Sequence, residues 1–173
     1  MEKIIKKGAE ASIYRGKWFG EVAIHKIRVP KKFRQQSLDI KLRALRTRHE
    51  ALLLSEAKRL GVITPLIYFV DKKQAEIVMQ FIPGRRLKEI IDACEEDMFT
   101  KWCREAGRYI ARLHSGAIIH GDLTTSNFII SNDKITVFFD YESEFITDSE
   151  EEYINYKRFN ALKEILNSEQ DEL

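Results

Sequence analysis

The segment His120-Gly-Asp-Leu-Thr-Thr-Ser-Asn127 constrains the fold of this chain more than any other stretch. An amphipathic helical pattern over 97–115 precedes it and an apolar hairpin pattern follows it, so the segment is a polar loop between a helix and strands. Asp122 can accept a hydrogen bond from a hydroxyl group, and Asn127 offers an amide oxygen of the kind that binds Mg²⁺. The alternative is a polar turn that an aspartate caps.

A second acidic position ends the apolar strand pattern over Ile135–Phe139. From there Asp140 can bridge Mg²⁺ to phosphate oxygens, unless it only begins a turn after the strand. Together, Asp122, Asn127 and Asp140 resemble the catalytic loop and the metal-binding aspartate of protein kinases. The resemblance implies Asp122 as the catalytic base, Asn127 and Asp140 as metal ligands, and ATP with Mg²⁺ as cofactors. Glu142 departs from the kinase pattern, which has a glycine at that position.

Two upstream segments have the residue types that grip phosphate. Val22-Ala-Ile-His-Lys26 resembles the kinase strand whose lysine binds the α- and β-phosphates, with one residue inserted. Glu50 is the best-placed acid on the following predicted helix, so we expect it to pair with Lys26. Before this strand, the loop Gly8-Ala9-Glu10-Ala11 can hold phosphate with its backbone N–H groups, although an ordinary turn has the same sequence features.

Strand patterns dominate the first half of the chain and helical patterns the second, with Pro83-Gly84 between them. The predicted strands lie at 11–16, 21–28, 66–70, 75–81, 128–130 and 135–139. The predicted helices lie at 37–60, with Gly61 as the residue after the cap, and at 86–93, 97–115 and 149–167. This order predicts an α+β chain of two lobes, with the boundary at Pro83-Gly84.

Several strings are particular to one group of kinases, namely Gly8-Ala-Glu-Ala11, Lys26-x-Arg28-x-Pro30-Lys31-x-Phe33-Arg34 and Arg46-Thr-Arg-His-Glu50. From about residue 6 to residue 166 the chain resembles the small atypical Ser/Thr kinases of the KEOPS (or EKC) complex, a PRPK-like family related to the Rio kinases. The resemblance implies a reduced protein-kinase-like fold, with a small β-rich N-lobe and one long helix over 1–82 and a truncated helical C-lobe over 83–173.

The same resemblance implies an activity and a set of partners. It implies autophosphorylation and a Ser/Thr kinase or ATPase activity that supports threonylcarbamoyl modification of adenosine in tRNA, and it links the group to telomere upkeep. It implies catalytic roles for Asp122, Lys26 and Glu50, and nucleotide contacts at the Gly8–Ala11 loop, Lys26, Gln80, Ile82, Asn127 and Asp140. The implied partners are the sugar-kinase-like tRNA threonylcarbamoyltransferase subunit and a small regulatory subunit.

The charge of the chain is divided along the sequence. Residues 1–90 contain 21 Lys+Arg and 9 Asp+Glu, whereas residues 91–173 contain 8 Lys+Arg and 18 Asp+Glu. Because a one-sided charge favours polyanionic partners, we expect tRNA phosphates to bind the most cationic segment, unless that segment is only a solvated helix face. The expected contacts are Lys31, Lys32, Arg34, Lys41 and Arg43.

The compartment is indicated only by what the sequence lacks. No stretch has the ~18 apolar residues of a membrane span, and the first residues do not form an apolar secretion signal. Cys94 and Cys103 are expected to be reduced thiols. We therefore expect a protein of the cytoplasm, and also of the nucleus if the source is eukaryotic, with no membrane partner.

Two other functions share these motifs. Glu142 and the single glycine of the Gly8–Ala11 loop are compatible with a catalytically weakened, pseudokinase-type binding subunit. Small-molecule phosphotransferases of the aminoglycoside or choline kinase type share His-Gly-Asp-Leu and a later Asn, but they use a larger helical part to build the acceptor pocket. Only 33 residues follow Asp140, which makes this alternative the weaker of the two.

Overall fold

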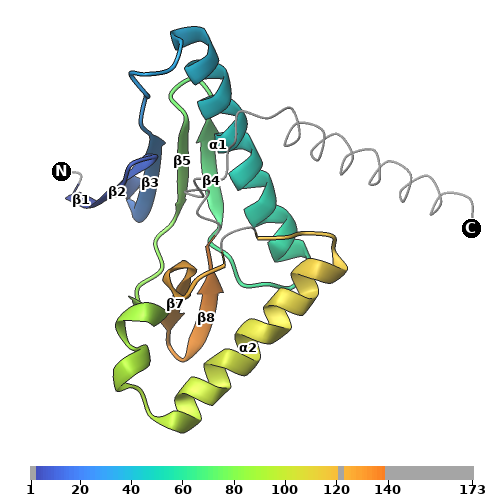
Figure 1. The fold of residues 1–173 in the computed structure, drawn as a ribbon. Coiled ribbons are helices and arrows are strands. Elements are labelled where there is room, and N and C mark those ends of the chain that lie inside the picture. Colours follow the sequence, from blue (N-terminus) through green and yellow to red (C-terminus); the bar gives the residue numbers. More distant parts are fainter. Residues whose placement is uncertain (1–2, 121–122, 139–173) are drawn as a thin grey trace, which may run out of the picture. The chain divides into compact units, whose positions relative to one another are not determined.

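The computed structural model describes residues 3–120 and 123–138 of the chain. The chain divides into two units, residues 1–142 and residues 143–173, and only the first contains described residues. Its strands are β1 (Lys3–Lys7), β2 (Ala11–Trp18), β3 (Glu21–Arg28), β4 (Ile67–Asp71), β5 (Glu76–Gln80), β6 (Arg85–Arg86), β7 (Phe128–Ser131) and β8 (Lys134–Val137). Its helices are α1 (Gln36–Arg59) and α2 (Glu96–Ser115), and short 3₁₀ turns cover Leu87–Glu89, Ile91–Ala93 and Thr125–Asn127 (Figure 1).

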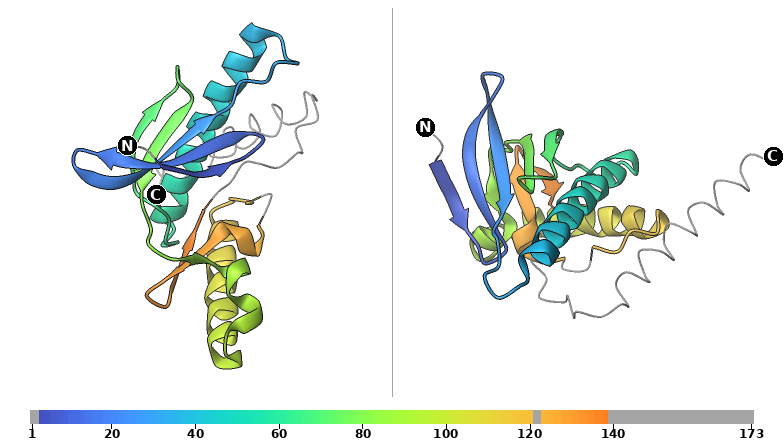
Figure 2. Two further views of the ribbon diagram at one scale, coloured as in Figure 1. Left: turned by 90° about the vertical axis from the view of Figure 1, so that its left-hand side faces the viewer. Right: turned by 90° about the horizontal axis from the view of Figure 1, so that it is seen from above.

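The first five strands form one antiparallel sheet in the order β1-β2-β3-β5-β4. The predicted strands over 11–16 and 21–28 are confirmed, and they form a hairpin, because β2 and β3 pair from Ala11 opposite Arg28 to Trp18 opposite Glu21. β4 and β5 also form where the sequence predicts them, whereas β1 was not predicted. Figure 2 shows this sheet along one side of α1, so the strands and the helix form two layers. The lysine and the glutamate that we expect to pair therefore lie on facing layers.

The end of α1 confirms the predicted helix boundary. Gly61 has a φ of 76°, in the left-handed region that favours glycine. Its N–H donates to the carbonyl of Lys58, and the N–H of Val62 donates to the carbonyl of Ala57. These two bonds form a Schellman motif, which satisfies carbonyl groups that the helix itself leaves unpaired.

The faces of α1 depart from the usual amphipathic pattern. The leucines whose spacing predicts the helix are Leu38, Leu42, Leu45, Leu52 and Leu53. Of these, Leu38, Leu45 and Leu52 are 45%, 44% and 38% exposed, whereas Leu42 is half-buried and Leu53 is buried. The buried face is mostly ionic and polar over the first half of the helix and apolar over the second. Its buried residues are Asp39, Arg46, Thr47, Glu50, Ala51, Leu53, Leu54 and Ala57. Contacts with charged partners, and not an apolar core, therefore hold the first half of the helix.

A second antiparallel sheet has the order β6-β7-β8 and contains the predicted hairpin around residues 131–134. Asn132 and Asp133 form its two-residue turn, and both have positive φ, which asparagine and aspartate tolerate better than most residues. The predicted helix over 86–93 is wrong. Arg85 and Arg86 pair with β7 instead, and Ile90, with φ of −125°, separates two 3₁₀ turns.

One apolar core joins α2 to this hairpin and to the end of α1. The helix predicted over 97–115 is confirmed, and its buried side chains are Trp102, Tyr109 and Leu113. They pack in the same cluster as Leu53 and Leu54 of α1 and the apolar residues of β7 and β8. Within the described ranges, no helix combines the length and the apolar character of a membrane span.

Two predictions about the second half of the chain remain predictions. The helix over 149–167 lies outside the described residues. The proposed lobe boundary at Pro83-Gly84 falls between the two sheets, inside the unit formed by residues 1–142.

Candidate active site

The structure brings Lys26 of β3 against Glu50 of α1. Lys26 Nζ donates a hydrogen bond to Glu50 Oε1 at 2.8 Å. The lysine side chain is 6% exposed and the glutamate side chain 1%, so water screens this ion pair little. The pairing expected from the sequence is thus present, while its role in gripping phosphate stays a prediction.

A third charged residue, Arg28, contacts the same carboxylate and was not identified from the sequence. Arg28 Nη2 donates to Glu50 Oε2 at 2.6 Å, and its side chain is 3% exposed. Side chains alternate between the two faces of a strand, so residues 26 and 28 of β3 point toward the same helix. This period of two was the available signal, because it places a second cation beside Lys26.

The Gly8–Ala11 loop forms a tight turn that is attached to α1. The Gly8 N–H donates to the Ala11 carbonyl at 2.9 Å. Glu10 extends from this turn to Lys31 at 2.5 Å and to Arg46 at 3.0 Å. Burial raises the pKa of the Glu10 carboxyl, but the hydrogen bond and charge of Lys31, with the charges of Arg46 and Arg34, hold it below its usual value. The loop that we expect to bind phosphate therefore contributes a carboxylate, Glu10, which pairs with Lys31 and Arg46.

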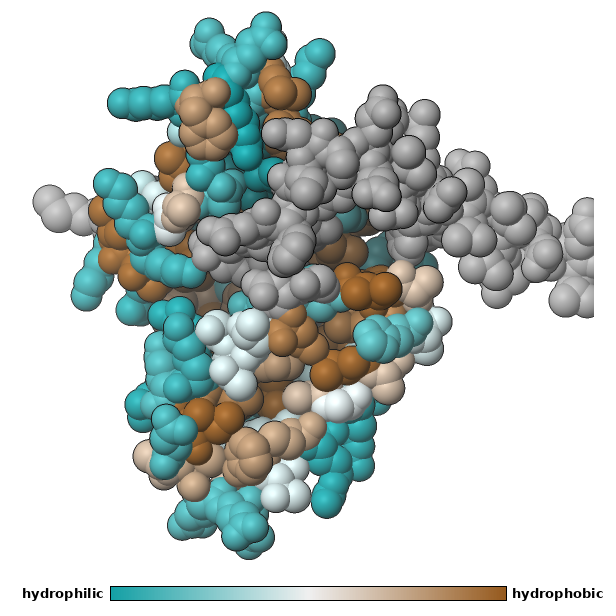
Figure 3. All heavy atoms as spheres, viewed as in Figure 1, coloured by the Kyte–Doolittle hydropathy of each residue, from teal (hydrophilic) through white to brown (hydrophobic). Residues whose placement is uncertain are grey.

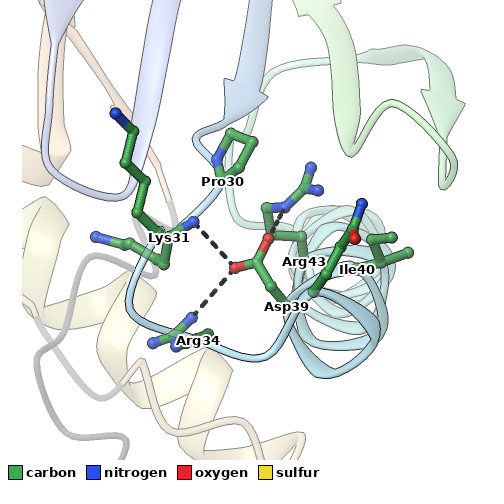
Figure 4. A pocket seen from close by; sticks show the side chains of 8 residues that line it. Pro30, Lys31, Arg34, Asp39, Ile40 and Arg43 are labelled. Atoms are coloured by element: carbon green, nitrogen blue, oxygen red, sulfur yellow. Dashed lines mark hydrogen bonds and ion pairs between the residues drawn. The ribbon is translucent and has the colours of Figure 1, made fainter.

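The cationic segment before α1 and the first turns of α1 line a cavity of about 330 Å³, and Figure 4 shows the Asp39 carboxylate directed toward Lys31, Arg34 and Arg43. Asp39 accepts from the Lys31 N–H at 3.2 Å and from Arg43 Nε at 2.7 Å, and Arg34 lies 3.9 Å away. Burial raises the pKa of Asp39, but these partners outweigh burial and lower it below its usual value. Three of the five predicted tRNA contacts thus pair with carboxylates of this chain.

The other two predicted tRNA contacts, Lys32 and Lys41, are exposed. Neither forms an ion pair with another residue of the described ranges 3–120 and 123–138. Figure 3 shows hydrophilic side chains predominating where α1 begins. Lys32 and Lys41 are therefore the cations of this segment that are free to meet an external anion.

The polar loop between α2 and β7 is bonded to the end of β8. The Phe138 N–H donates to the Asn127 carbonyl at 2.9 Å, and His120 Nε2 lies 2.8 Å from the Phe138 carbonyl oxygen. Because a carbonyl oxygen only accepts, Nε2 is the nitrogen of His120 that donates. His120 and Asn127 are both buried. The predicted residues Asp122 and Asp140, and also Glu142, lie outside the described residues.

The last two predicted nucleotide contacts, Gln80 and Ile82, lie at the end of β5 and just after it. The Gln80 N–H donates to the Leu66 carbonyl at 2.8 Å, and the Gln80 side-chain oxygen accepts from the Leu66 N–H at 3.3 Å. The side chain of Gln80 thus bonds to the segment before β4. Ile82 is half-buried in the connection between β5 and β6. The structure gives no direct test of either residue as a nucleotide contact.

Two described residues have the chemistry that a nucleotide carrying Mg²⁺ needs. Lys26 is a buried cation that could bind phosphate, and Asn127 has a side-chain amide that could hold the metal together with Asp140, which lies outside the described residues. No group of three or more His, Cys, Asp or Glu within the described ranges forms a metal site, so the predicted Mg²⁺ site rests on Asn127 and Asp140. Bound Mg²⁺ would neutralise phosphate charge and orient the terminal phosphoryl group.

A strand lysine paired with a helix glutamate, beside a loop bonded to a strand end, defines a protein-kinase-like fold. The protein kinase domain family matches residues 2–161, and the chain belongs to this family. In fold the chain resembles the Rio2 kinase of Chaetomium thermophilum, crystallised as an ADP/Mg²⁺-phosphoaspartate complex, with a TM-score of 0.65 and 18% identity. That match covers 80% of this chain and 46% of the other.

Named relatives are more similar in sequence. The KEOPS complex subunit Bud32 of Pyrococcus abyssi is 44% identical over 140 residues, which are 77% of this chain and 63% of the relative. A probable bifunctional tRNA threonylcarbamoyladenosine biosynthesis protein of Methanothermobacter thermautotrophicus is 45% identical over 138 residues, 80% of this chain and 24% of the relative. The expected resemblance to the KEOPS group is thereby confirmed, although the chain spans less than two thirds of each relative's length.

Proposed function

We propose that the chain is an ATP- and Mg²⁺-dependent atypical kinase, with Ser/Thr kinase or ATPase activity, that supports threonylcarbamoyladenosine formation in tRNA. The observation that carries the proposal is the buried pair of Lys26 and Glu50, a strand lysine bonded to a helix glutamate as in protein kinases. Lys26 would hold phosphate, Asp122 would accept the hydrogen bond of the attacking hydroxyl, and Asn127 with Asp140 would hold Mg²⁺. The names of the relatives support the link to tRNA.

We also propose that this chain works beside a larger component. The matched segment is 24% of relatives whose names give two functions, so the remaining part of those chains has room for a second activity. The partners that we propose are a sugar-kinase-like threonylcarbamoyltransferase subunit and a small regulatory subunit. We propose the cytoplasm as the place of action, with the nucleus added in a eukaryote.

The activity is tested by incubating the chain with γ-labelled ATP and Mg²⁺, with and without the transferase subunit. We expect label on the protein, or released phosphate, and its loss in Asp122→Ala by about 10²–10⁴-fold, the usual contribution of a general base. Asp92→Ala, at an exposed aspartate of a 3₁₀ turn, is the matched control and should keep the activity.

Other outcomes of this assay identify the alternatives. No binding of nucleotide by the wild-type chain would contradict the proposal and support a pseudokinase-type binding subunit. Label that moves to added choline or to an aminoglycoside, and not to protein, would instead indicate a small-molecule phosphotransferase.

Contact with tRNA is proposed for the cationic segment before and within α1. Lys32 and Lys41 are the informative positions, because Lys31, Arg34 and Arg43 balance carboxylates of the chain. We expect Lys32→Glu/Lys41→Glu to weaken tRNA binding and to reduce the slope of log K against log[salt] by about 2, or one per lost phosphate contact.

Filter binding or fluorescence anisotropy at several salt concentrations measures this slope. The matched control is Lys88→Glu/Lys101→Glu, with the same charge change at exposed positions outside the cationic segment. An equal effect of both double variants would show only general charge attraction and would remove the assignment to Lys32 and Lys41.

A further inference from the structure

Glu50 binds a second cation, Arg28, for which neither the family resemblance nor the relatives of the chain indicate a role. Its two carboxylate oxygens are divided between two donors, Lys26 on Oε1 at 2.8 Å and Arg28 on Oε2 at 2.6 Å. All three side chains are at most 6% exposed. A carboxylate in such a place depends on its donors, because water cannot replace them.

The backbone of Arg28 is fixed independently of α1. Arg28 pairs with Ala11 of β2, and its N–H donates to the Ala75 carbonyl at 3.0 Å. The next N–H, of Val29, donates to the Glu10 carbonyl at 2.9 Å. The guanidinium group therefore extends from a rigid part of the sheet and can act as an anchor for the helix.

The first half of α1 has few other means of attachment. Its contacts with the sheet and with the segment before the helix are ionic or polar, as in the ion pair of Arg46 with Glu10 and the hydrogen bond from the Lys31 N–H to Asp39. The apolar core begins only at Ala51 and Leu53. Of these polar contacts, the one between Arg28 and Glu50 is the most buried.

We propose that Arg28 is a positioning residue that holds Glu50, and through it the middle of α1, in place whether or not nucleotide is bound. In protein kinases the lysine–glutamate pair must form before phosphoryl transfer, and activation-loop phosphorylation controls its formation. Here Arg28 keeps the glutamate beside Lys26 without such a switch. The effect on α1 stands on its own, and only the effect on turnover rests on the proposed function.

Amide hydrogen exchange of the chain without nucleotide tests this role in Arg28→Met, Arg28→Lys and Lys26→Met. We expect Arg28→Met to raise exchange of residues 43–52 about tenfold or more, as loss of a charge-assisted hydrogen bond predicts. Arg28→Lys should restore much of the protection, and Lys26→Met should change it less than Arg28→Met, because the shorter and more buried of the two bonds, from Arg28, remains. If the methionine variant does not fold, Arg28→Gln takes its place, and the same increase is expected.

Turnover gives a second measurement. If the proposed function holds, Arg28→Met should lower kcat at least tenfold with KM for ATP changed about threefold or less, and Arg28→Lys should recover most of kcat. Wild-type protection of α1 in a folded Arg28→Met or Arg28→Gln variant would overturn the proposal, as would equal loosening by Lys26→Met. Absence of turnover in the wild-type chain would count against the proposed function alone, since exchange still reports on Arg28.

Discussion

Glu50→Leu is expected to lower the free energy of unfolding by about 3–5 kcal/mol, the usual cost of removing one member of a buried ion pair. The substitution leaves Lys26 and Arg28 facing each other with side chains at most 6% exposed. Two like charges without an anion then share a poorly hydrated space. Denaturant unfolding of the full chain, followed by circular dichroism, measures the change through its midpoint and slope.

A matched control and a compensated variant make this result specific. Glu56→Leu removes a carboxylate from the same helix, where Glu56 pairs with a largely exposed Arg59, and should cost about 1 kcal/mol or less. Lys26→Met/Arg28→Met/Glu50→Leu removes all three charges and should recover most of the lost stability, because an apolar triad needs no hydration. A Glu50→Leu variant as stable as Glu56→Leu would show that the triad contributes little to the fold.

Gly84→Ala is expected to destabilise the chain by about 1–3 kcal/mol, because a side chain at this position has no space. A Cβ atom on Gly84 would lie 2.3 Å from the Ile130 carbonyl oxygen and 2.7 Å from Ile129 Cγ2. The first of these atoms belongs to the backbone of β7 and cannot rotate away. The methyl group would therefore push β6 from its pairing with β7, at the junction between the two sheets.

The control for this substitution is Gly107→Ala. A Cβ atom on Gly107, inside α2, meets nothing within 4 Å. Alanine has a helix propensity about 1 kcal/mol better than glycine, so this variant should gain stability. Thermal or denaturant unfolding of both variants gives opposite signs if the close approach of Gly84 to β7 is real. A stabilised Gly84→Ala variant would show that the two segments are further apart.

The pairing of Lys26 with Glu50 was accessible from the sequence because each residue lies in a strong local pattern. The segment of Lys26 resembles the kinase strand that carries the phosphate-binding lysine, and Glu50 is the best-placed acid on the predicted helix that follows. The second partner, Arg28, was missed because a motif describes one lysine and one glutamate. The period of two along β3 places residues 26 and 28 on the same face and was the signal that could have identified it.

In the cationic segment, the sequence overestimated how many residues are available to an external anion. A count of charges treats Lys31, Arg34 and Arg43 as available for an external anion, yet each of them pairs with Glu10 or Asp39. Glu10 lies 21 residues before Lys31, so proximity in sequence does not reveal that pair, whereas Asp39 lies only five residues from Arg34 and four from Arg43. Only Lys32 and Lys41 keep the role that the charge pattern indicated, as a prediction.

The leucines of α1 show why a helical pattern does not identify the buried face. Their spacing was sufficient to predict the helix and its end at Gly61. It could not predict that the first half of the buried face is ionic, because the partners of Asp39, Arg46 and Glu50 come from three other segments. Hydrophobicity alone therefore identifies the buried side only toward the end of the helix, where Leu53, Leu54 and Ala57 are buried.

Both backbone polar groups of Phe138 bond to residues of the polar loop. The Phe138 N–H donates to the Asn127 carbonyl, and the Phe138 carbonyl accepts from the His120 ring. A strand end fixed in this way cannot turn about its own axis without breaking one of the two bonds. His120 and Asn127, at the two ends of the loop sequence, are therefore bonded to one and the same residue after β8, and displacing that residue would break a bond to one of them.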